Sequence, residues 1–159
     1  MKEIRRILQN PMSDDCVACV AAMATQTSVE TFKKIMRQPE GPYSDWQFNA
    51  YCMLYGFVVG SGFRWDKSPF DPAKEMIGAE VDLMNFPAYI VVDSETRSGV
   101  EHAIYWNSKE VFDPNPDADS QRPLSSYKII SVFPINHLDQ DGNITYSIMR
   151  RIISKRISK

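Results

Sequence analysis

The sequence predicts an α+β fold in which N-terminal helices pack against an antiparallel sheet. Apolar residues at helical spacing, with capping signals, occupy the first third of the chain, whereas short β-branched and aromatic runs bounded by Gly or Pro occupy most of the rest. Helical and strand patterns segregated in this way are typical of α+β proteins. The 159 residues, 43% of them hydrophobic and 24% charged, are sufficient for one core without disulfides.

The first helix is predicted over residues 15–25. Ser13, Asp14 and Asp15 are N-cap candidates, and the segment after them is so continuously small and apolar that we expect a helix buried on most sides. Cys16 then lies in the first helical turn, where free backbone N–H groups and the helix dipole favour a thiolate. Asp14 and Asp15 oppose a thiolate by charge repulsion, so a nearby cation is required.

Capping boxes predict two further helices. In this signature a Ser or Thr accepts a hydrogen bond from the backbone three residues later, and a Glu or Gln at that position reaches back. Thr27 with Glu30 begins one helix, and Ser44 with Gln47 begins the next, which Gly56 ends. The residues of this third helix expected to reach the core are Trp46, Tyr51, Met53 and Leu54.

Strands are predicted in the second half of the chain. Residues 57–59 and 87–92 are short β-branched and aromatic runs, and the second run is apolar enough for a central strand covered on both faces. A short helix is expected at residues 73–84. Three further strands are predicted at residues 102–106, 110–113 and 127–134.

A hairpin across residues 102–113 would bring a His and an Asp together. If Asn107 and Ser108 form a two-residue turn, Tyr105 pairs with Glu110, and His102 stands opposite Asp113. Directly opposed side chains share a face with Cβ atoms about 5 Å apart, which allows the carboxylate to accept a hydrogen bond from the imidazole. Such a hydrogen bond orients the imidazole in many catalytic sites. The alternative interpretation is an ordinary cross-strand pair without a catalytic role.

The three cysteines leave more than one chemistry open. Their odd, low number argues against a disulfide framework. Cys16 and Cys19 form a C-x-x-C motif at a helix start, as in thiol–disulfide proteins, but no apolar strand leads directly into it. A zinc site of Cys16, Cys19, Cys52 and His102 lacks the second close ligand pair of structural zinc sites. Buried packing is the expectation for Cys19 and Cys52.

Three segments are together similar to a known family. They are residues 8–23, 102–106 and 111–114. In sequence and order they resemble the papain-like peptidase domain that trims double-glycine leaders from bacteriocin precursors. The resemblance implies a papain-like fold, a triad of Cys16, His102 and Asp113, and oxyanion hydrogen bonds from Gln9 and the Cys16 backbone N–H.

The sequence departs from the family pattern at two places near Cys16. Gln9 lies seven residues before Cys16, where the family usually has six, so Asn10 occupies the expected position. Either amide could therefore be the oxyanion donor. Val17 replaces the glycine that normally follows the nucleophile, and its side chain is expected to crowd the approach of a substrate.

The predicted function is that of a cysteine-dependent hydrolase. The simplest reading is a peptidase acting on a peptide or isopeptide bond, although deamidases, amidases and acyl transferases use the same machinery. A non-catalytic binding module that keeps the papain-like scaffold is one alternative, and a C-x-x-C thiol–disulfide protein is another. We expect residues 1–135 to form the peptidase domain. Residues 136–159 would form an extension with a basic amphipathic segment that packs on the domain or contacts an acidic partner.

Composition and charge exclude several other classes. A net charge of −2 and a pI near 5.7 lack the basic footprint of a dedicated nucleic-acid binder. No apolar run approaches the roughly 18 residues of a membrane span, and the first residues have no continuous apolar stretch of a secretory signal. We therefore expect a cytoplasmic protein that acts on a protein or peptide substrate, with no cofactor and no metal.

Overall fold

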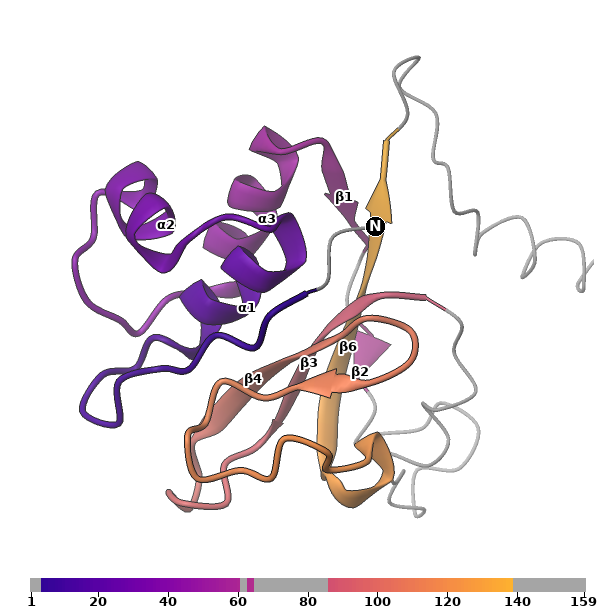
Figure 1. Cartoon of the computed structure of the whole chain (residues 1–159). Helices are drawn as coiled ribbons and strands as arrows, with labels where there is room; N and C mark the ends of the chain where they lie inside the picture. Colours follow the sequence, from indigo (N-terminus) through magenta and orange to yellow (C-terminus); the bar gives the residue numbers. More distant parts are fainter. Residues whose placement is uncertain (1–3, 61–62, 65–85, 139–159) are drawn as a thin grey trace, which may run out of the picture.

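The computed structural model of the chain describes residues 4–60, 63–64 and 86–138, in which helices precede strands (Figure 1). The helices are α1 (Cys16–Thr25), α2 (Val29–Met36) and α3 (Asp45–Leu54). The strands are β1 (Phe57–Val59), β2 (Phe63–Arg64), β3 (Ala88–Asp93), β4 (Glu101–Trp106), β5 (Val111–Phe112) and β6 (Ile129–His137). This order confirms the predicted α+β class.

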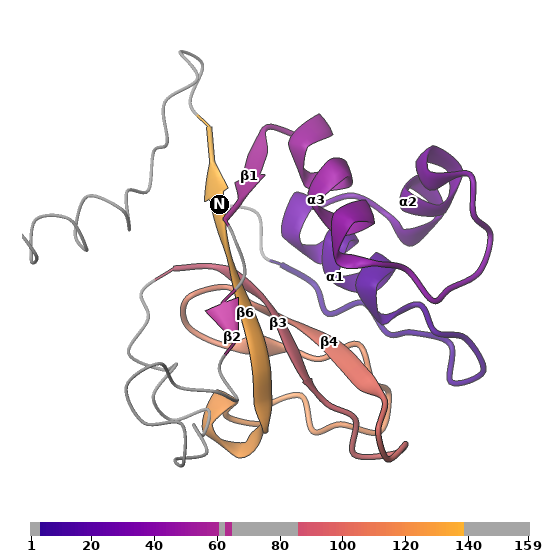
Figure 2. The ribbon, with the colours of Figure 1, turned by 180° about the vertical axis from the view of Figure 1, so that it is seen from behind.

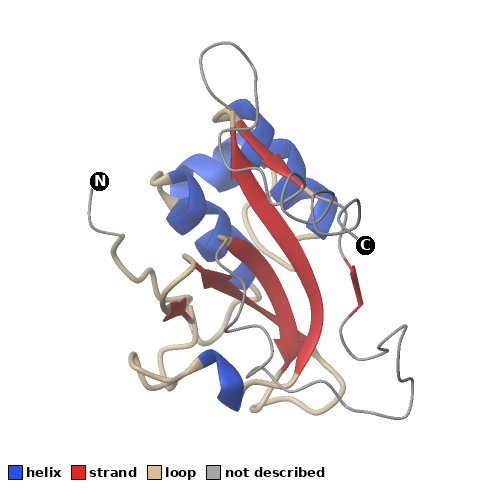
Figure 3. Cartoon of the chain, turned by 90° about the vertical axis from the view of Figure 1, so that its right-hand side faces the viewer, coloured by secondary structure: helices blue, strands red, loops and turns tan. Residues whose placement is uncertain are grey.

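The described strands form one antiparallel sheet. Its order is β1-β6-β3-β4-β5, and β2 also pairs with β6. The three helices gather on one side of this sheet in opposite views of the molecule (Figures 1 and 2). Figure 3 shows the same layering from the side, with the helices lying along the long curved strands. The predicted packing of N-terminal helices on an antiparallel sheet is confirmed.

The central strand β3 separates two apolar clusters. Alternation along a strand sends Tyr89 and Val91 into the cluster that contains α1 and α3, and sends Ile90 and Val92 into a second cluster on the opposite face. A 3-10 helix at Leu124–Ser126 contributes to the second cluster. β3 is therefore covered on both faces, as its continuous apolar sequence predicted.

α1 is the most enclosed helix. All of its residues after Cys16 are buried, and it packs against α2, α3 and β4. Small side chains in this segment let neighbouring elements approach closely, which accounts for the burial of nearly every position. The helix ends at Gln26, whose backbone adopts the left-handed conformation. Only its first turn, at Cys16, reaches a partly accessible position.

The caps of α2 and α3 differ in how well they were predicted. α2 is capped by Ser28, whose Oγ accepts from the Thr31 N–H at 3.1 Å, so the prediction of Thr27 as its cap is wrong by one residue. Thr27 instead hydrogen-bonds to the Tyr51 hydroxyl at 2.7 Å. The capping box of Ser44 at the start of α3 is confirmed.

The buried face of α3 was predicted correctly only at Tyr51. Helical spacing places Phe48, Tyr51 and Cys52 on one face, and these three are fully buried. The other expected core residues lie on the remaining sides of the helix, with exposed fractions of 66–68%: Trp46, Met53 and Leu54. Burial was overpredicted because apolar character was counted without the helical period.

The predicted strands are all present among the described residues, with ends that differ by up to three residues. β2 was not predicted, since only two residues form it. β6 continues to His137, past the predicted domain end at residue 135, and the Leu138 N–H donates to the Gly56 carbonyl at 2.9 Å. The helix expected at 73–84 and the basic segment of the extension lie outside the described residues.

The register of the β4–β5 hairpin differs from the predicted one by two residues. Tyr105 pairs with Phe112 instead of Glu110, because residues 107–110 form a four-residue loop. The Asn107 side chain stabilises this loop by accepting the Lys109 and Glu110 N–H groups, each at 2.9 Å. A shift of two residues keeps every side chain on its face, so His102 and Asp113 become diagonal neighbours on the same face rather than directly opposed.

Gly41 marks the closest approach between the α2–α3 loop and the segment before α1. A Cβ at this position would lie 2.0 Å from the Asp14 carbonyl oxygen. The Gly41 N–H also donates to the Asp15 carboxylate at 3.3 Å. The loop is therefore packed backbone to backbone against the residues that lead into Cys16.

We predict that Gly41→Ala destabilises the fold by about 2–3 kcal/mol, because backbone must move to admit the methyl group. Gly60→Ala is the matched control, since the nearest atoms that a Cβ there meets among the described residues belong to Pro134, at an ordinary 3.6 Å. Urea unfolding of the two variants checks this prediction. Equal free energies of unfolding would contradict it.

Candidate active site

Cys16 stands at the N-terminal end of α1, and the acids before it are both paired with cations. Asp15 is 4% exposed, and its carboxylate accepts from Lys33 Nζ at 2.6 Å. Asp14 forms an ion pair with Arg97 at 2.5 Å. These partners reduce the charge repulsion that Asp14 and Asp15 were expected to exert on a thiolate. Neither cation could be assigned from the sequence, because each comes from a distant element.

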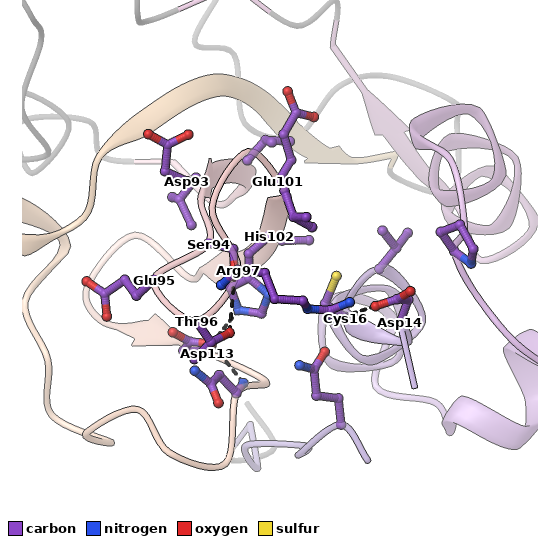
Figure 4. A pocket seen from close by; sticks show the side chains of 18 of the residues that line it. Asp14, Cys16, Asp93, Ser94, Glu95, Thr96, Arg97, Glu101, His102 and Asp113 are labelled. Carbon is purple, nitrogen blue, oxygen red and sulfur yellow. Dashed lines mark hydrogen bonds and ion pairs between the residues drawn. The ribbon is translucent and has the colours of Figure 1, made fainter. Parts of the chain in front are cut away.

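His102 joins Cys16 to Asp113. Its Nε2 lies 2.7 Å from Asp113 Oδ1, and the Cys16 side chain is near enough to raise the pKa of the imidazole. Because Nε2 is engaged by Asp113, Nδ1 is the ring nitrogen left for a second partner. The structure thus brings together all three residues of the predicted triad, from the start of α1, the start of β4 and the end of β5 (Figure 4).

The hydrogen bonds in this cluster shift the pKa values of both His102 and Asp113. Burial lowers the pKa of His102, but the hydrogen bond to Asp113 and the interaction with the Cys16 side chain oppose burial and raise it to about 9. Burial raises the pKa of Asp113, but the hydrogen bond and charge of His102, with the hydrogen bonds from Asn115 and Tyr127, together outweigh burial and leave it below the ordinary value. The favoured state at neutral pH is therefore an imidazolium held by a carboxylate.

The Asp113 carboxylate is held by three donors. Oδ1 accepts from His102 and from the Asn115 N–H at 2.8 Å, and Oδ2 accepts from the Tyr127 hydroxyl at 2.8 Å. The Tyr127 ring is in turn covered by the Arg122 guanidinium, 3.9 Å from its centre. This set of bonds fixes which carboxylate oxygen faces the imidazole.

Sequence reasoning missed the residues that support Asp113. Tyr127 was assigned only to a strand, and Arg6 was not singled out. The Arg6 side chain donates to the backbone carbonyl of Asp113 at 2.6 Å. A buried carboxylate signals that donors must exist. Their identity depends on the loops that surround the site, which the sequence does not reveal.

Gln9 lines the same cavity as Cys16, whereas Asn10 does not. The Gln9 N–H donates to the Pro114 carbonyl at 2.8 Å, which fixes its segment beside Asp113. Its Oε1 is buried without a hydrogen-bond partner. Asn10 is exposed, and its Oδ1 accepts from the Met12 N–H at 3.0 Å. Of the two amides left open by the sequence, Gln9 is the one that lies in the cavity.

The other two cysteines lie in the core. Cys19 is 1% exposed and Cys52 is 0% exposed, and burial raises the pKa of each thiol to about 12. Both act as small apolar side chains, which confirms the expected packing role. The burial of Cys19 also speaks against a C-x-x-C exchange site, because its sulfur is not accessible to a second thiol or disulfide.

The candidate residues line a cavity of about 380 Å³ (Figure 4). The loop between β3 and β4 forms one wall, and its Arg97 reaches across to Asp14 beside Cys16. Val17 also lines the cavity, next to Cys16. Within the described ranges, no three His, Cys, Asp or Glu side chains gather as a metal site. No helix in the described part of the chain has the length and apolar character of a membrane span.

The architecture, three helices packed on an antiparallel sheet, is of the α+β class. A solved structure that shares it is the peptidase domain of Streptococcus ComA, a bi-functional ABC transporter involved in a quorum-sensing pathway. The two are 14% identical with a TM-score of 0.51, and the match covers 83% of this chain and 98% of that domain. The resemblance inferred from the sequence is confirmed for the fold. Neither a protein-family model nor a curated protein matches the chain.

We predict that stability falls as pH rises from about 6.5 to 9. The pKa of His102 is about 9 in the folded chain and 6.5 as an ordinary imidazole, so its protonation stabilises the fold fully below pH 6.5. This contribution, on the order of 3 kcal/mol, is lost as pH rises through 9. Urea unfolding across this range measures it. A His102→Gln variant should show a flat profile, and an equal slope in both proteins would contradict the assignment.

Proposed function

We propose that the chain is a cysteine peptidase with Cys16 as nucleophile, His102 as general base and acid, and Asp113 as the residue that orients His102. One observation supports this most directly: the His102 imidazole is hydrogen-bonded to a buried carboxylate and lines the same cavity as the partly accessible Cys16 at the start of a helix. The shared fold with a peptidase domain supports the class of reaction. The proposed substrate is a peptide, which the likeness of the fold to a peptidase domain supports, and Cys16 lies at the wall of the cavity that would receive it.

The first half of the proposed reaction forms an acyl-enzyme. The thiol proton of Cys16 passes to Nδ1 of His102, which gives the imidazolium that is favoured at neutral pH, and the thiolate of Cys16 then attacks the carbonyl carbon of the scissile bond. Negative charge moves to the carbonyl oxygen, where the Gln9 amide and the free N–H of Cys16 in the first helical turn donate hydrogen bonds. The carbonyl re-forms as the C–N bond breaks, and His102 gives its proton to the leaving amine.

The second half releases the product. Water enters, His102 removes one of its protons, and the resulting hydroxide attacks the thioester carbonyl. The tetrahedral species collapses, the C–S bond breaks, and the proton held by His102 returns to the Cys16 sulfur. Asp113 stays ionised throughout and holds the imidazole through Nε2, as the lowered pKa of its carboxyl favours.

Val17 shapes the substrate that this site accepts. It is 6% exposed and lies at the cavity wall directly after the nucleophile. A branched side chain here narrows the approach to the end of α1, so bulky groups next to the scissile carbonyl are disfavoured. The same machinery would transfer the acyl group to an amine if water were excluded, so product analysis decides between hydrolysis and transfer.

We predict that the purified chain cleaves members of a diverse peptide library, read out by mass spectrometry of the new termini. Cys16→Ser should abolish cleavage, and Gln9→Ala should lower kcat about 100-fold through loss of one oxyanion donor. Asn10→Ala, the neighbouring amide outside the cavity, is the matched control and should retain normal turnover. Cleavage that persists in Cys16→Ser, or no cleavage or acyl transfer by the native chain, would overturn the proposal.

A further inference from the structure

Arg6 connects the N-terminal segment to the loop that carries Asp113. Its Nε donates to the Asp113 carbonyl at 2.6 Å, and its Nη2 donates to the carbonyls of Asn115 and Ala118 at 2.6 and 2.9 Å. The residues joined are more than 100 positions apart in the chain. Three bonds from one guanidinium to one short loop are a specific geometry, because the donors of Arg have fixed directions.

The loop from Asp113 to Ala118 needs such a donor. It follows β5, which is only two residues long and lies at the edge of the sheet. The internal bonds of this loop are the Asn115 N–H to Asp113 Oδ1, the Asp117 N–H to Asn115 Oδ1 and the Ala118 N–H to the Asn115 carbonyl, and none of them uses the Asp113 or Ala118 carbonyl. Arg6 donates hydrogen bonds to carbonyl groups of the loop that are not paired within the sheet. The conformation of the loop therefore depends on Arg6 as well as on the loop's own hydrogen bonds.

The same two segments are joined a second time at Gln9. The Gln9 N–H donates to the Pro114 carbonyl, between two of the carbonyls that Arg6 holds. The N-terminal segment and the Asp113 loop therefore lie side by side, fixed by bonds from Arg6 and from Gln9. The oxyanion donor and the residue that orients His102 thus belong to one cross-linked unit.

We propose that Arg6 is a positioning residue that holds Asp113 and Gln9 in their places beside each other at the wall of the cavity. This inference rests on the proposed cysteine peptidase function. Arg6 acts through the backbone of the Asp113 loop, and it contacts neither Cys16 nor the substrate. Its role is geometric: when the loop shifts, the carboxylate moves away from Nε2 and the imidazole loses its orientation toward the sulfur.

Arg6→Lys separates geometry from charge. Lysine keeps the positive charge but offers a single ammonium group, which cannot reproduce bonds from two guanidinium nitrogens to three carbonyls. Arg5→Lys is the matched control, because Arg5 is the exposed neighbour with the same chemistry and is outside the cavity of Cys16. The readout is the rate of Cys16 alkylation by iodoacetamide at pH 6 and at pH 10, mapped to the labelled peptide. Cys19 and Cys52 are buried and give no background.

Arg6→Lys should slow alkylation at pH 6 about tenfold or more, where reaction depends on the imidazolium, and leave the rate at pH 10 unchanged. The Arg5→Lys variant should be alkylated at the same rate as the native chain at both pH values. A merely structural role would lower the unfolding temperature of Arg6→Lys without changing the ratio of the two rates, and that outcome would overturn the inference. In His102→Ala the pH 6 rate must also fall, and if it does not, the proposed function itself fails.

A second measurement uses the native chain and does not depend on a variant that folds. The Nε–H of Arg6, as donor to a backbone carbonyl, should exchange slowly with deuterated water in NMR spectra, whereas that of exposed Arg5 should exchange rapidly. Equal, rapid exchange at both side chains would show that the loop is not held by Arg6 and would overturn the inference.

Discussion

The hydrogen bond between the His102 imidazole and the buried Asp113 carboxylate is the interaction on which the candidate site depends. Burial alone would favour a neutral imidazole, but the carboxylate reverses that preference and, by engaging Nε2, leaves Nδ1 for a second partner. An ionised Asp113 is itself costly in the interior, so Asn115 and Tyr127 supply the remaining bonds to its oxygens. None of these donors contacts Cys16 directly. Removing one of them would therefore change the reactivity of the Cys16 sulfur only by changing the position or the pKa of the imidazole.

The fold brings the three candidate residues together, although they are far apart in the sequence. The helical cluster fixes Cys16, because α1 is buried along its whole length after the first turn. The sheet fixes His102 at the start of β4, and the edge strand β5 delivers Asp113. The arrangement costs chain entropy, since these elements are far apart in sequence, and two apolar clusters on either face of β3 offset that cost.

Local patterns predicted most of the elements and the three residues that meet at the site. They failed where long-range contacts decide the outcome. The four-residue loop at Asn107 depends on side-chain bonds to the backbone, yet the two-residue shift preserved the faces of His102 and Asp113. The cations beside Asp14 and Asp15, and the support of Asp113 by Arg6, come from remote segments that no local pattern connects.

The most direct test of this account is an NMR titration of the His102 ring, with His137→Gln used to assign the two histidine signals. The imidazole should titrate near pH 9 in the native chain, and Asp113→Asn should bring its pKa down by removing the charged acceptor. A ring that titrates near 6.5 in the native chain, or one that Asp113→Asn leaves unchanged, would contradict the central claim.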